Sequence, residues 1–298
     1  RRQRQMCIRD RWKDYELLDA SDGEKLERWG DVILLRPDPQ IVWTVSEADK
    51  SKLWRAADAR YDRSHTGGGS WKTFKKLPKS WTIDYRELKF GIKPMGFKHT
   101  GLFPEQAANW DWFSDIIKNS GRPKNEVNVL NLFAYTGGAT MAASAAGASV
   151  CHVDAAKGMV TWAKENAVLS GLDERPIRYI VDDVKKFVER EFRRGRKYDG
   201  IIMDPPSYGR GPGGEVWKIE NELFGLIESC LNVMSDNPLF FLVNSYTTGM
   251  SGNVMSNIYK LTLCKKFGGE IDIDEIGLPV TNGGLVLPCG YSARWVKR

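Results

Sequence analysis

The chain has 298 residues, of which 42% are hydrophobic, and a formal net charge of +6 at pH 7, which is ordinary for a globular protein of one or two domains. No apolar run approaches the roughly 18 residues that a membrane span needs, so neither a membrane protein nor a membrane partner is expected. The five scattered cysteines form no Cys-x-x-Cys pair and only three histidines accompany them, so no metal site or disulfide framework is predicted and a reducing, cytoplasmic location is favoured.

Positive charge is concentrated near the beginning of the chain. Residues 1–100 hold 22 Lys and Arg against 15 Asp and Glu, an excess that suits a segment meeting a polyanion. More than half of this excess comes from residues 1–11, which have no initiator methionine at their start and no apolar periodicity. We interpret residues 1–11 as a tail or an artefact of cloning or sequence assembly. Without them the charge gives only weak support for a polyanionic partner.

Residues 12–96 are predicted to form a small β-rich domain. Short strands separated by turns are expected at residues 31–36, 40–45, 81–85 and 88–93. A helix over about 47–59 is also possible. The segment Lys72–Lys79, with Trp71 and Trp81 beside it, mixes cations and aromatic rings as an RNA-contacting surface does, but it fits a solvated loop equally well.

Residues 97–298 are assigned to a second domain, in which strands alternate with helices from about Asn109 onward. Five strands are predicted at residues 127–133, 149–154, 177–181, 198–203 and 239–243. Five helices are predicted at residues 137–148, 157–169, 184–194, 215–234 and 254–264. Two closing strands, 270–276 and 285–296, have only turn residues between them and should form an antiparallel hairpin at the sheet edge. The expected fold class is α/β, with a Rossmann-like, seven-stranded, mostly parallel sheet beside the β-rich domain.

The most informative junction follows the strand at residues 198–203, which runs directly into Asp204-Pro205-Pro206-Ser207-Tyr208-Gly209. A carboxylate, two rigid prolines and an aromatic ring at the carboxyl end of a buried strand would make a stiff shelf beside a ligand crevice. Such a shelf suits a flat, polar target such as a nucleobase. The same residues are also good turn formers, so this stretch alone leaves a site and a simple turn equally open.

Three other strand ends carry suitable residues. After the first strand, Asn131–Ala139 supplies two hydroxyls and adjacent glycines, where a backbone can approach a ligand. The second strand ends at Asp154, sixteen residues after Gly138, a spacing that commonly places a carboxylate on a ribose diol. The third ends at Asp182 and Asp183, which could accept from an exocyclic amine. Glycines also permit close packing and aspartates also cap helices, but four coincident strand ends favour an adenosine-type ligand.

The glycine pattern separates the adenosine cofactors. A dinucleotide site requires Gly-x-Gly-x-x-Gly, so that a pyrophosphate can rest on the helix N-terminus. This loop has only the adjacent pair Gly137 and Gly138 and no basic residue. It fits a small zwitterionic tail better, and S-adenosylmethionine (SAM) has such a tail.

Together these motifs resemble the class I SAM-dependent methyltransferases, specifically the branch of 23S ribosomal RNA methyltransferases with a small β domain ahead of the Rossmann-like domain. The resemblance rests on Asn131–Ala139, Val153–Ala155, Asp182–Val184 and Asp204–Tyr208. Upstream, Gly96–Gln106 is similar to that family's Lys-Thr-Gly-aromatic-x-x-Asp-Gln motif. The similarity spans roughly residues 30 to 296.

The resemblance implies a SAM site and an acceptor site. The residues implied around the methionine part of SAM are Asn131, Phe133, Tyr135, Thr136 and Gly137. Asp154 would bind the ribose hydroxyls with Ala155 beside it, and Asp183, next to Asp182, would face the adenine amine. Further cofactor-pocket residues would be Thr100, Gln106 and Asp204. The acceptor would be held by Asp204 and Pro205, next to Pro206, with Tyr208 stacking on it. Because a sulfonium is already activated, positioning would do most of the work, and the Phe133 and Tyr135 rings could orient it.

One departure from the family pattern narrows the acceptor. Members that methylate carbon 5 of cytosine use a cysteine just after the fifth strand, where this chain has Val243–Thr248 without cysteine. Carbon 5 is a poor nucleophile without a cysteine adduct, so a nitrogen acceptor is favoured, and Cys230 and Cys289 are interpreted as structural. The same motif occurs in nitrogen methyltransferases acting on bases and on glutamine, so protein and small-molecule amines stay open.

Three functional hypotheses follow. The first is a SAM-dependent methyltransferase acting on RNA, with ribosomal RNA as the expected partner. The second is a nicotinamide-dependent oxidoreductase on a Rossmann sheet. The third is a non-catalytic RNA-binding or assembly factor, which the intact motifs disfavour because such a protein would be free to lose Asp204 or the glycines.

Overall fold

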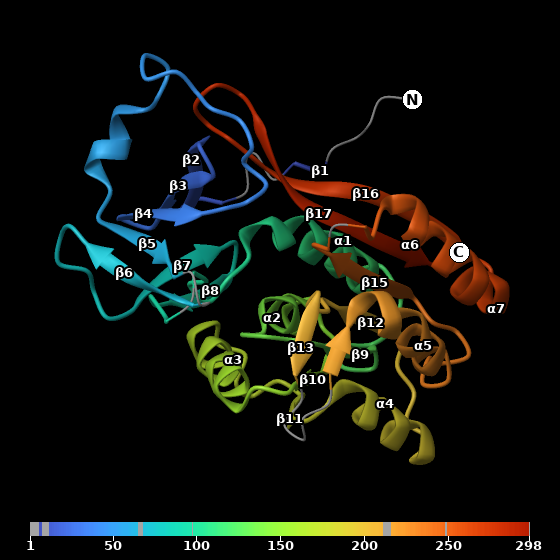
Figure 1. Ribbon diagram of the computed structural model, residues 1–298. Coiled ribbons are helices and arrows are strands. Elements are labelled where there is room, and N and C mark those ends of the chain that lie inside the picture. Colours follow the sequence, from blue (N-terminus) through green and yellow to red (C-terminus); the bar gives the residue numbers. More distant parts are fainter. Residues whose placement is uncertain are drawn as a thin grey trace. The chain divides into compact units, whose positions relative to one another are not determined.

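The structure, a computed structural model, describes residues 6–7, 12–64, 68–96, 98–210, 216–247 and 249–297 (Figure 1). The predicted tail over residues 1–11 lies outside these residues, apart from Met6–Cys7, which form strand β1. The chain divides into two compact units. The sheet unit comprises Arg1–Met6, Gln106–Ile276 and Gly290–Arg298, and the β unit comprises Cys7–Glu105 and Gly277–Cys289.

The α/β fold class is confirmed. The large sheet has the strand order β1-β16-β17-β15-β12-β9-β10-β11, so the seven expected strands are present and the two-residue β1 adds an edge beyond β16. The strands are β9 (Asn128–Leu132), β10 (Ser149–Asp154), β11 (Ile177–Val181), β12 (Gly200–Met203), β15 (Phe240–Ser245), β16 (Glu270–Pro279) and β17 (Val286–Val296). From β11 to β15 every pairing is parallel, and β17 runs antiparallel to β15.

The helices lie on both faces of this sheet. They are α1 (Ala107–Lys118), α2 (Gly138–Ala145), α3 (Lys157–Leu169), α4 (Val184–Arg193), α5 (Ile219–Leu231) and α6 (Gly252–Tyr259), followed by the π-helix η3 (Lys260–Cys264) and the short α7 (Lys265–Phe267). The helix α1 packs against α2 and α2 against α3, while α4 packs against α5 and α5 against η3. The helices α2 and α3 connect strands in the direction of β11, and α4 and α5 connect strands in the direction of β15. Because crossovers between parallel strands are right-handed, these two pairs of helices lie on opposite faces of the sheet.

The chain reverses direction across the sheet between β9 and β12. From β9 it proceeds outward through β10 to β11, and then returns to β12 on the other side of β9. In open parallel sheets such a reversal leaves a ligand crevice outside the carboxyl ends of the strands. A ligand site is therefore expected at the residues that follow β9 and β12.

The β unit contains two small sheets, and one strand expected in it is absent. Its strands are β2 (Tyr15–Ser21), β3 (Glu24–Trp29), β4 (Val32–Pro37), β5 (Ala59–Arg63) and β6 (Gly69–Thr73) in one sheet and β7 (Trp81–Tyr85) with β8 (Leu88–Ile92) in the other. The prediction of a strand at 40–45 is wrong. Its carbonyls at Ile41 and Trp43 accept from the Gly23 and Asp22 amides, but the Ile41 and Val42 amides donate only to carbonyls nearby in the chain, so no strand ladder forms. The helix expected near 47–59 is reduced to a 3-10 helix at Lys52–Ala56.

No helix in the described ranges combines the length and apolar character needed to cross a bilayer.

Candidate functional site

Four strand ends meet at one edge of the sheet unit. Parallel register pairs Leu132 with Val153 and with Met203, and Asp154 with Val181. Backbone bonds continue past the strands, from the Ala134 amide to Val153 and from the Asp182 amide to Asp154. The segments after β9, β10, β11 and β12, which carry the sequence-predicted residues, are thus neighbours.

The loop after β9 has an unusual backbone. Phe133, Tyr135 and Gly137 all adopt positive φ angles, of 53°, 50° and 85°. Such angles are costly for aromatic residues, because their Cβ crowds the backbone, and strain of this kind clusters at ligand sites. The loop is anchored where the Tyr135 amide donates to Oδ2 of Asp154 at 2.8 Å.

Asp154 holds two backbone groups at once. Its Oδ1 accepts from the Ala156 amide at 2.8 Å, while Oδ2 accepts from Tyr135. Burial raises the pKa of Asp154, against the lowering effect of these two N–H donors. The N-cap residue of α3 is Ala156 and not Asp154, so the simple capping alternative does not hold. Each carboxylate oxygen keeps a second lone pair for a ligand hydroxyl, with Ala155 exposed beside it.

The two aspartates after β11 have separate local partners. Asp183 caps α4, because its Oδ1 accepts from the Lys186 amide at 3.0 Å. Asp182 accepts from the Asp183 amide at 2.9 Å and forms an ion pair with Arg190. The capping alternative therefore holds for Asp183, and contact with an adenine amine stays a prediction for both residues.

Asn131 is tied into the core beneath the loop. Its Nδ2 donates to Oγ1 of Thr140 at 2.9 Å, and that hydroxyl lies 2.9 Å from Nδ1 of His152. Burial lowers the pKa of His152 to about 3, so the ring is neutral and its Nδ1 can accept the Thr140 proton. This chain of bonds connects β9, α2 and β10. Thr136 is also buried, and its carbonyl accepts from Nδ2 of Asn166 at 2.9 Å.

The adjacent glycines serve close helix packing. A Cβ on Gly138 would lie 2.6 Å from Cζ2 of Trp110 in α1, and one on Gly137 would lie 3.0 Å from Cβ of Ala163 in α3. Both glycines therefore permit close packing of helices, which is the alternative role that the sequence left open for them. Gly137 is also required for its positive φ angle.

We expect Gly138→Ala to lower the free energy of unfolding by about 1–3 kcal/mol, the usual cost of overpacking. Gly158→Ala is the matched control, because nothing lies within 4 Å of its added Cβ in the helix α3 and alanine favours helix. Urea unfolding of both variants measures the difference. Equal stability of the two variants would show that the contact with Trp110 does not constrain position 138.

The acceptor shelf, defined as Asp204 to Tyr208, is held from two sides. Pro205 is buried and Pro206 exposed. The carbonyl of Pro206 accepts from Nε1 of Trp217 at 2.6 Å, and the Trp217 ring lies 5.0 Å from the Phe133 ring. Tyr208, 51% exposed, begins β13 (Tyr208–Arg210), which pairs with β14 (Val216–Lys218). Trp217 thus connects the shelf to the loop after β9, and sequence reasoning missed it.

The segment after β15 reaches the same shelf. Hydroxyls of Ser207 and Thr247 lie 2.5 Å apart. Burial raises the pKa of each of the thiols of Cys151, Cys230, Cys264 and Cys289, to about 11 for Cys151. None of these four thiols is therefore poised as a thiolate nucleophile.

The two residues of the upstream motif belong to different units. Thr100 is buried in the β unit, where its carbonyl accepts from the Lys93 amide at 3.2 Å. Gln106 is the N-cap residue of α1 in the sheet unit, and its side chain makes no capping bond. Instead the Gln106 amide joins a buried group of polar side chains.

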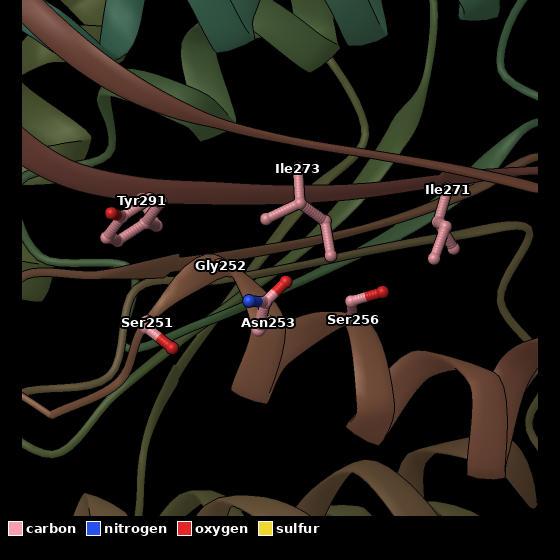
Figure 2. Close-up of a pocket in the computed structure, with 7 residues that line it drawn as sticks. All are labelled: Ser251, Gly252, Asn253, Ser256, Ile271, Ile273 and Tyr291. Atoms are coloured by element: carbon pink, nitrogen blue, oxygen red, sulfur yellow. The ribbon is translucent and has the colours of Figure 1, made fainter.

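A cavity of about 380 Å³ lies elsewhere in the sheet unit. Figure 2 shows Ile271, Ile273 and Tyr291 of β16 and β17 near Ser251 and Asn253 at the start of α6. None of its lining residues is a sequence-predicted site residue. Within the described part of the chain, no three His, Cys, Asp or Glu side chains group as a metal site would need.

Comparison with known proteins identifies relatives of the chain. The family profile described as S-adenosylmethionine-dependent methyltransferase matches residues 43–217. The crystal structure of the SAM-dependent methyltransferase from Agrobacterium tumefaciens is 36% identical, with a TM-score of 0.89, over 96% of this chain and 91% of that one. SMU.776 complexed with SAH shares the fold, at 20% identity and a TM-score of 0.72, over 97% of this chain and 76% of that one.

Curated relatives are larger than this chain. Ribosomal RNA large subunit methyltransferase K/L of Shewanella frigidimarina is 28% identical over 207 residues, which are 68% of this chain and 25% of that protein. Ribosomal RNA large subunit methyltransferase K of Neisseria meningitidis serogroup B is 26% identical over 186 residues, 62% of this chain and 51% of that protein. The matched region thus spans between a quarter and a half of these relatives.

Proposed function

The chain belongs to the S-adenosylmethionine-dependent methyltransferase family, and from this premise we propose that it methylates a base nitrogen of RNA, with ribosomal RNA as the substrate. The cofactor of the family is SAM. The observation that carries the acceptor proposal is the shelf itself, in which a carboxylate and a buried proline follow β12, while the segment Val243–Thr248 at the end of β15 has no cysteine. Ribosomal RNA as the substrate is supported by the names of the relatives in Shewanella and Neisseria. Such a substrate is consistent with a cytoplasmic location.

The residues after β9, β10 and β11 fit this cofactor chemically. The loop is uncharged and strained, the partly buried carboxylate of Asp154 can accept from a diol, and the Asp182–Asp183 pair can accept from an amine. SAM, when bound there, supplies a methyl group already activated on a sulfonium. The sheet-unit residues proposed to hold it are Asn131, Phe133, Tyr135, Thr136, Gly137, Asp154, Ala155, Asp182 and Asp183, whereas a cofactor contact of Thr100, in the β unit, stays a prediction of the resemblance.

The shelf is proposed to position the acceptor. The Asp204 carboxylate and the Pro205 carbonyl would accept hydrogen bonds from an N–H of the base, so that the nitrogen lone pair faces the methyl group. Asp204 would also accept the proton that the methylated nitrogen loses. Tyr208, exposed and two residues after Pro206, would stack on the base.

The proposal is tested by incubating the purified chain with tritiated SAM and protein-free ribosomal RNA. We expect tritium in RNA, and N-methylated nucleosides after digestion. A chain that binds SAM but transfers no tritium to the RNA would contradict the RNA substrate. Calorimetric titration distinguishes the oxidoreductase alternative, because tight NAD(P)H binding without SAM binding would contradict the proposed reaction.

A further inference from the structure

We propose that Gln106 is a positioning residue for the acceptor shelf and is not a wall of the cofactor pocket. It belongs to an amide cluster, which we define as Gln106, Asn109, Asn244, Ser292 and Arg294. The inference rests on the proposed function, because it assigns a role toward the acceptor of that reaction. It reverses the role that the sequence resemblance implies for Gln106.

The amide cluster joins three elements. From α1, Nδ2 of Asn109 lies 3.0 Å from Oε1 of Gln106, 2.9 Å from Oδ1 of Asn244 on β15 and 2.8 Å from Oγ of Ser292 on β17. Ser292 in turn donates to Oδ1 of Asn244 at 2.8 Å. Arg294 Nη2 and Nε donate to Oδ1 of Asn109 at 2.6 and 2.9 Å.

The cluster is buried as well as bonded. Its five side chains belong to residues that are no more than 7% exposed. Burial lowers the pKa of Arg294 to about 10, with Asp272 and Asp274 opposing that change, so the guanidinium stays charged at neutral pH. The guanidinium also lies 5.1 Å from the centre of the Trp112 ring. Buried polar groups cost free energy unless they are satisfied, and a satisfied network fixes one arrangement of its parts.

Gln106 has little bonding capacity left for a cofactor. Its Oε1 accepts from Asn109 and also from Nδ2 of Asn244 at 2.8 Å, which uses both lone pairs of a carbonyl oxygen. Its Nε2 donates to the hydroxyl of Tyr246 at 2.5 Å. Both ends of the amide are therefore directed toward α1, β15 and the segment after β15.

A chain of contacts then leads from Gln106 to the shelf. Tyr246 lies two residues after Asn244 and immediately before Thr247. The Thr247 hydroxyl meets the Ser207 hydroxyl at 2.5 Å, three residues beyond Asp204. Because Met203 pairs with Val243 in register, Asp204 and Asn244 stand at neighbouring strand ends. The amide cluster thus fixes the segment that supports the shelf.

The test measures cofactor binding and methyl transfer to RNA separately, so that an effect on the acceptor site can be distinguished from an effect on the SAM site. Calorimetry gives the Kd for SAM, and transfer of tritiated methyl to protein-free ribosomal RNA gives kcat and KM for RNA. The first variant is Gln106→Leu, which removes the amide. Because it leaves buried polar partners unsatisfied and can impair folding, a second pair, Thr247→Val and Thr247→Ser, tests the other end of the chain of contacts.

We expect Gln106→Leu to lower kcat/KM for RNA by about 10- to 100-fold, the cost of misplacing a reacting group, with an unchanged Kd for SAM. Thr247→Val should also lower kcat/KM for RNA. Thr247→Ser keeps the hydroxyl, so its kcat/KM should fall less. Tyr291→Phe is the control, because the Tyr291 side chain lines the cavity of Figure 2, and the hydrogen bonds described above for the amide cluster do not include its hydroxyl.

Two results would overturn the inference and leave the proposed function intact. One is a Gln106→Leu chain with weakened SAM binding and an unchanged KM and kcat for RNA. The other is a Thr247→Val chain, fully folded, that methylates RNA like Thr247→Ser. If the wild-type chain binds SAM but labels no RNA, the proposed function fails, and the inference fails with it.

Discussion

Asp204→Ala is expected to lower methyl transfer to RNA by about 10²- to 10⁴-fold, the range for removing a positioned proton acceptor. Asp204 is partly buried at the end of β12, and the buried Pro205 follows it. Backbone bonds extend from the Asp204 amide to Leu132 and from the Ile219 amide to Ser207. The carboxylate is therefore presented by a segment with few alternative conformations, and removing it should remove the contact without rebuilding the shelf.

The loss should be in the transfer step and not in cofactor affinity. We expect the Kd for SAM to change little in Asp204→Ala, since the loop after β9 and Asp154 stay in place. Tyr208→Ala is a useful comparison, because a stacking side chain should mainly raise KM for RNA, by about 5- to 100-fold per lost base contact. An Asp204→Ala chain that keeps wild-type kcat would exclude Asp204 as the acceptor-holding carboxylate.

Asp154→Ala is expected to weaken SAM binding by about 100-fold or more. Hydrogen bonds to a charged group contribute about 1.5–3 kcal/mol each, and about 1.4 kcal/mol corresponds to a factor of ten. The variant removes the acceptor for Tyr135 and Ala156 as well as the proposed contact with the ribose. The Asp154→Asn variant should also bind SAM poorly. The side-chain NH₂ of asparagine would face the N–H of either Tyr135 or Ala156, and two donors cannot form a hydrogen bond with each other.

SAM binding should also depend on pH through Asp154. Burial raises the pKa of this carboxyl, and only the carboxylate accepts fully from the two amides and a diol. Affinity should therefore fall as the pH is lowered through the raised pKa, by about tenfold per pH unit below it. The stability of the protein without SAM depends on pH in the opposite direction. Because the pKa of Asp154 is raised on folding, the folded state binds the proton more tightly, and the contribution of this group to the free energy of unfolding grows as the pH falls through the raised pKa. Calorimetry over a pH series measures the effect, and its absence would contradict a direct role of Asp154.

The sheet unit was predictable because its strands are short apolar runs that alternate with amphipathic helices. The bounds expected for β10, α3 and β11 are those observed. Prediction was wrong at 40–45, where β-branched residues suggest a strand but Val42 is 88% exposed and none of the described strands pairs with the segment. The start of the helix expected at 215–234 is instead β14, which pairs with β13 across the shelf. Strand propensity cannot reveal whether a partner exists.

The candidate site was predictable where chemistry follows strand ends, and less so where it depends on distant contacts. The places of Asp154 at the end of β10 and of Asp204 directly after β12 were predicted correctly, and their roles toward cofactor and acceptor stay predictions. Trp217 and Asn109 were missed, because their contacts with Pro206 and Asn244 connect residues far apart in the sequence. The helix α1 was also missed, although Trp110, Phe113 and Ile117 repeat at helical spacing.

The central proposal is methylation of a base nitrogen in ribosomal RNA. Its most direct test is mass spectrometry of nucleosides from ribosomal RNA of cells with the protein, without it, and with Asp204→Ala. We predict that one N-methylated nucleoside is lost without the protein, returns with the wild-type chain and stays absent with Asp204→Ala. Identical nucleoside profiles in all three, or loss of a carbon-methylated base instead, would contradict the proposal.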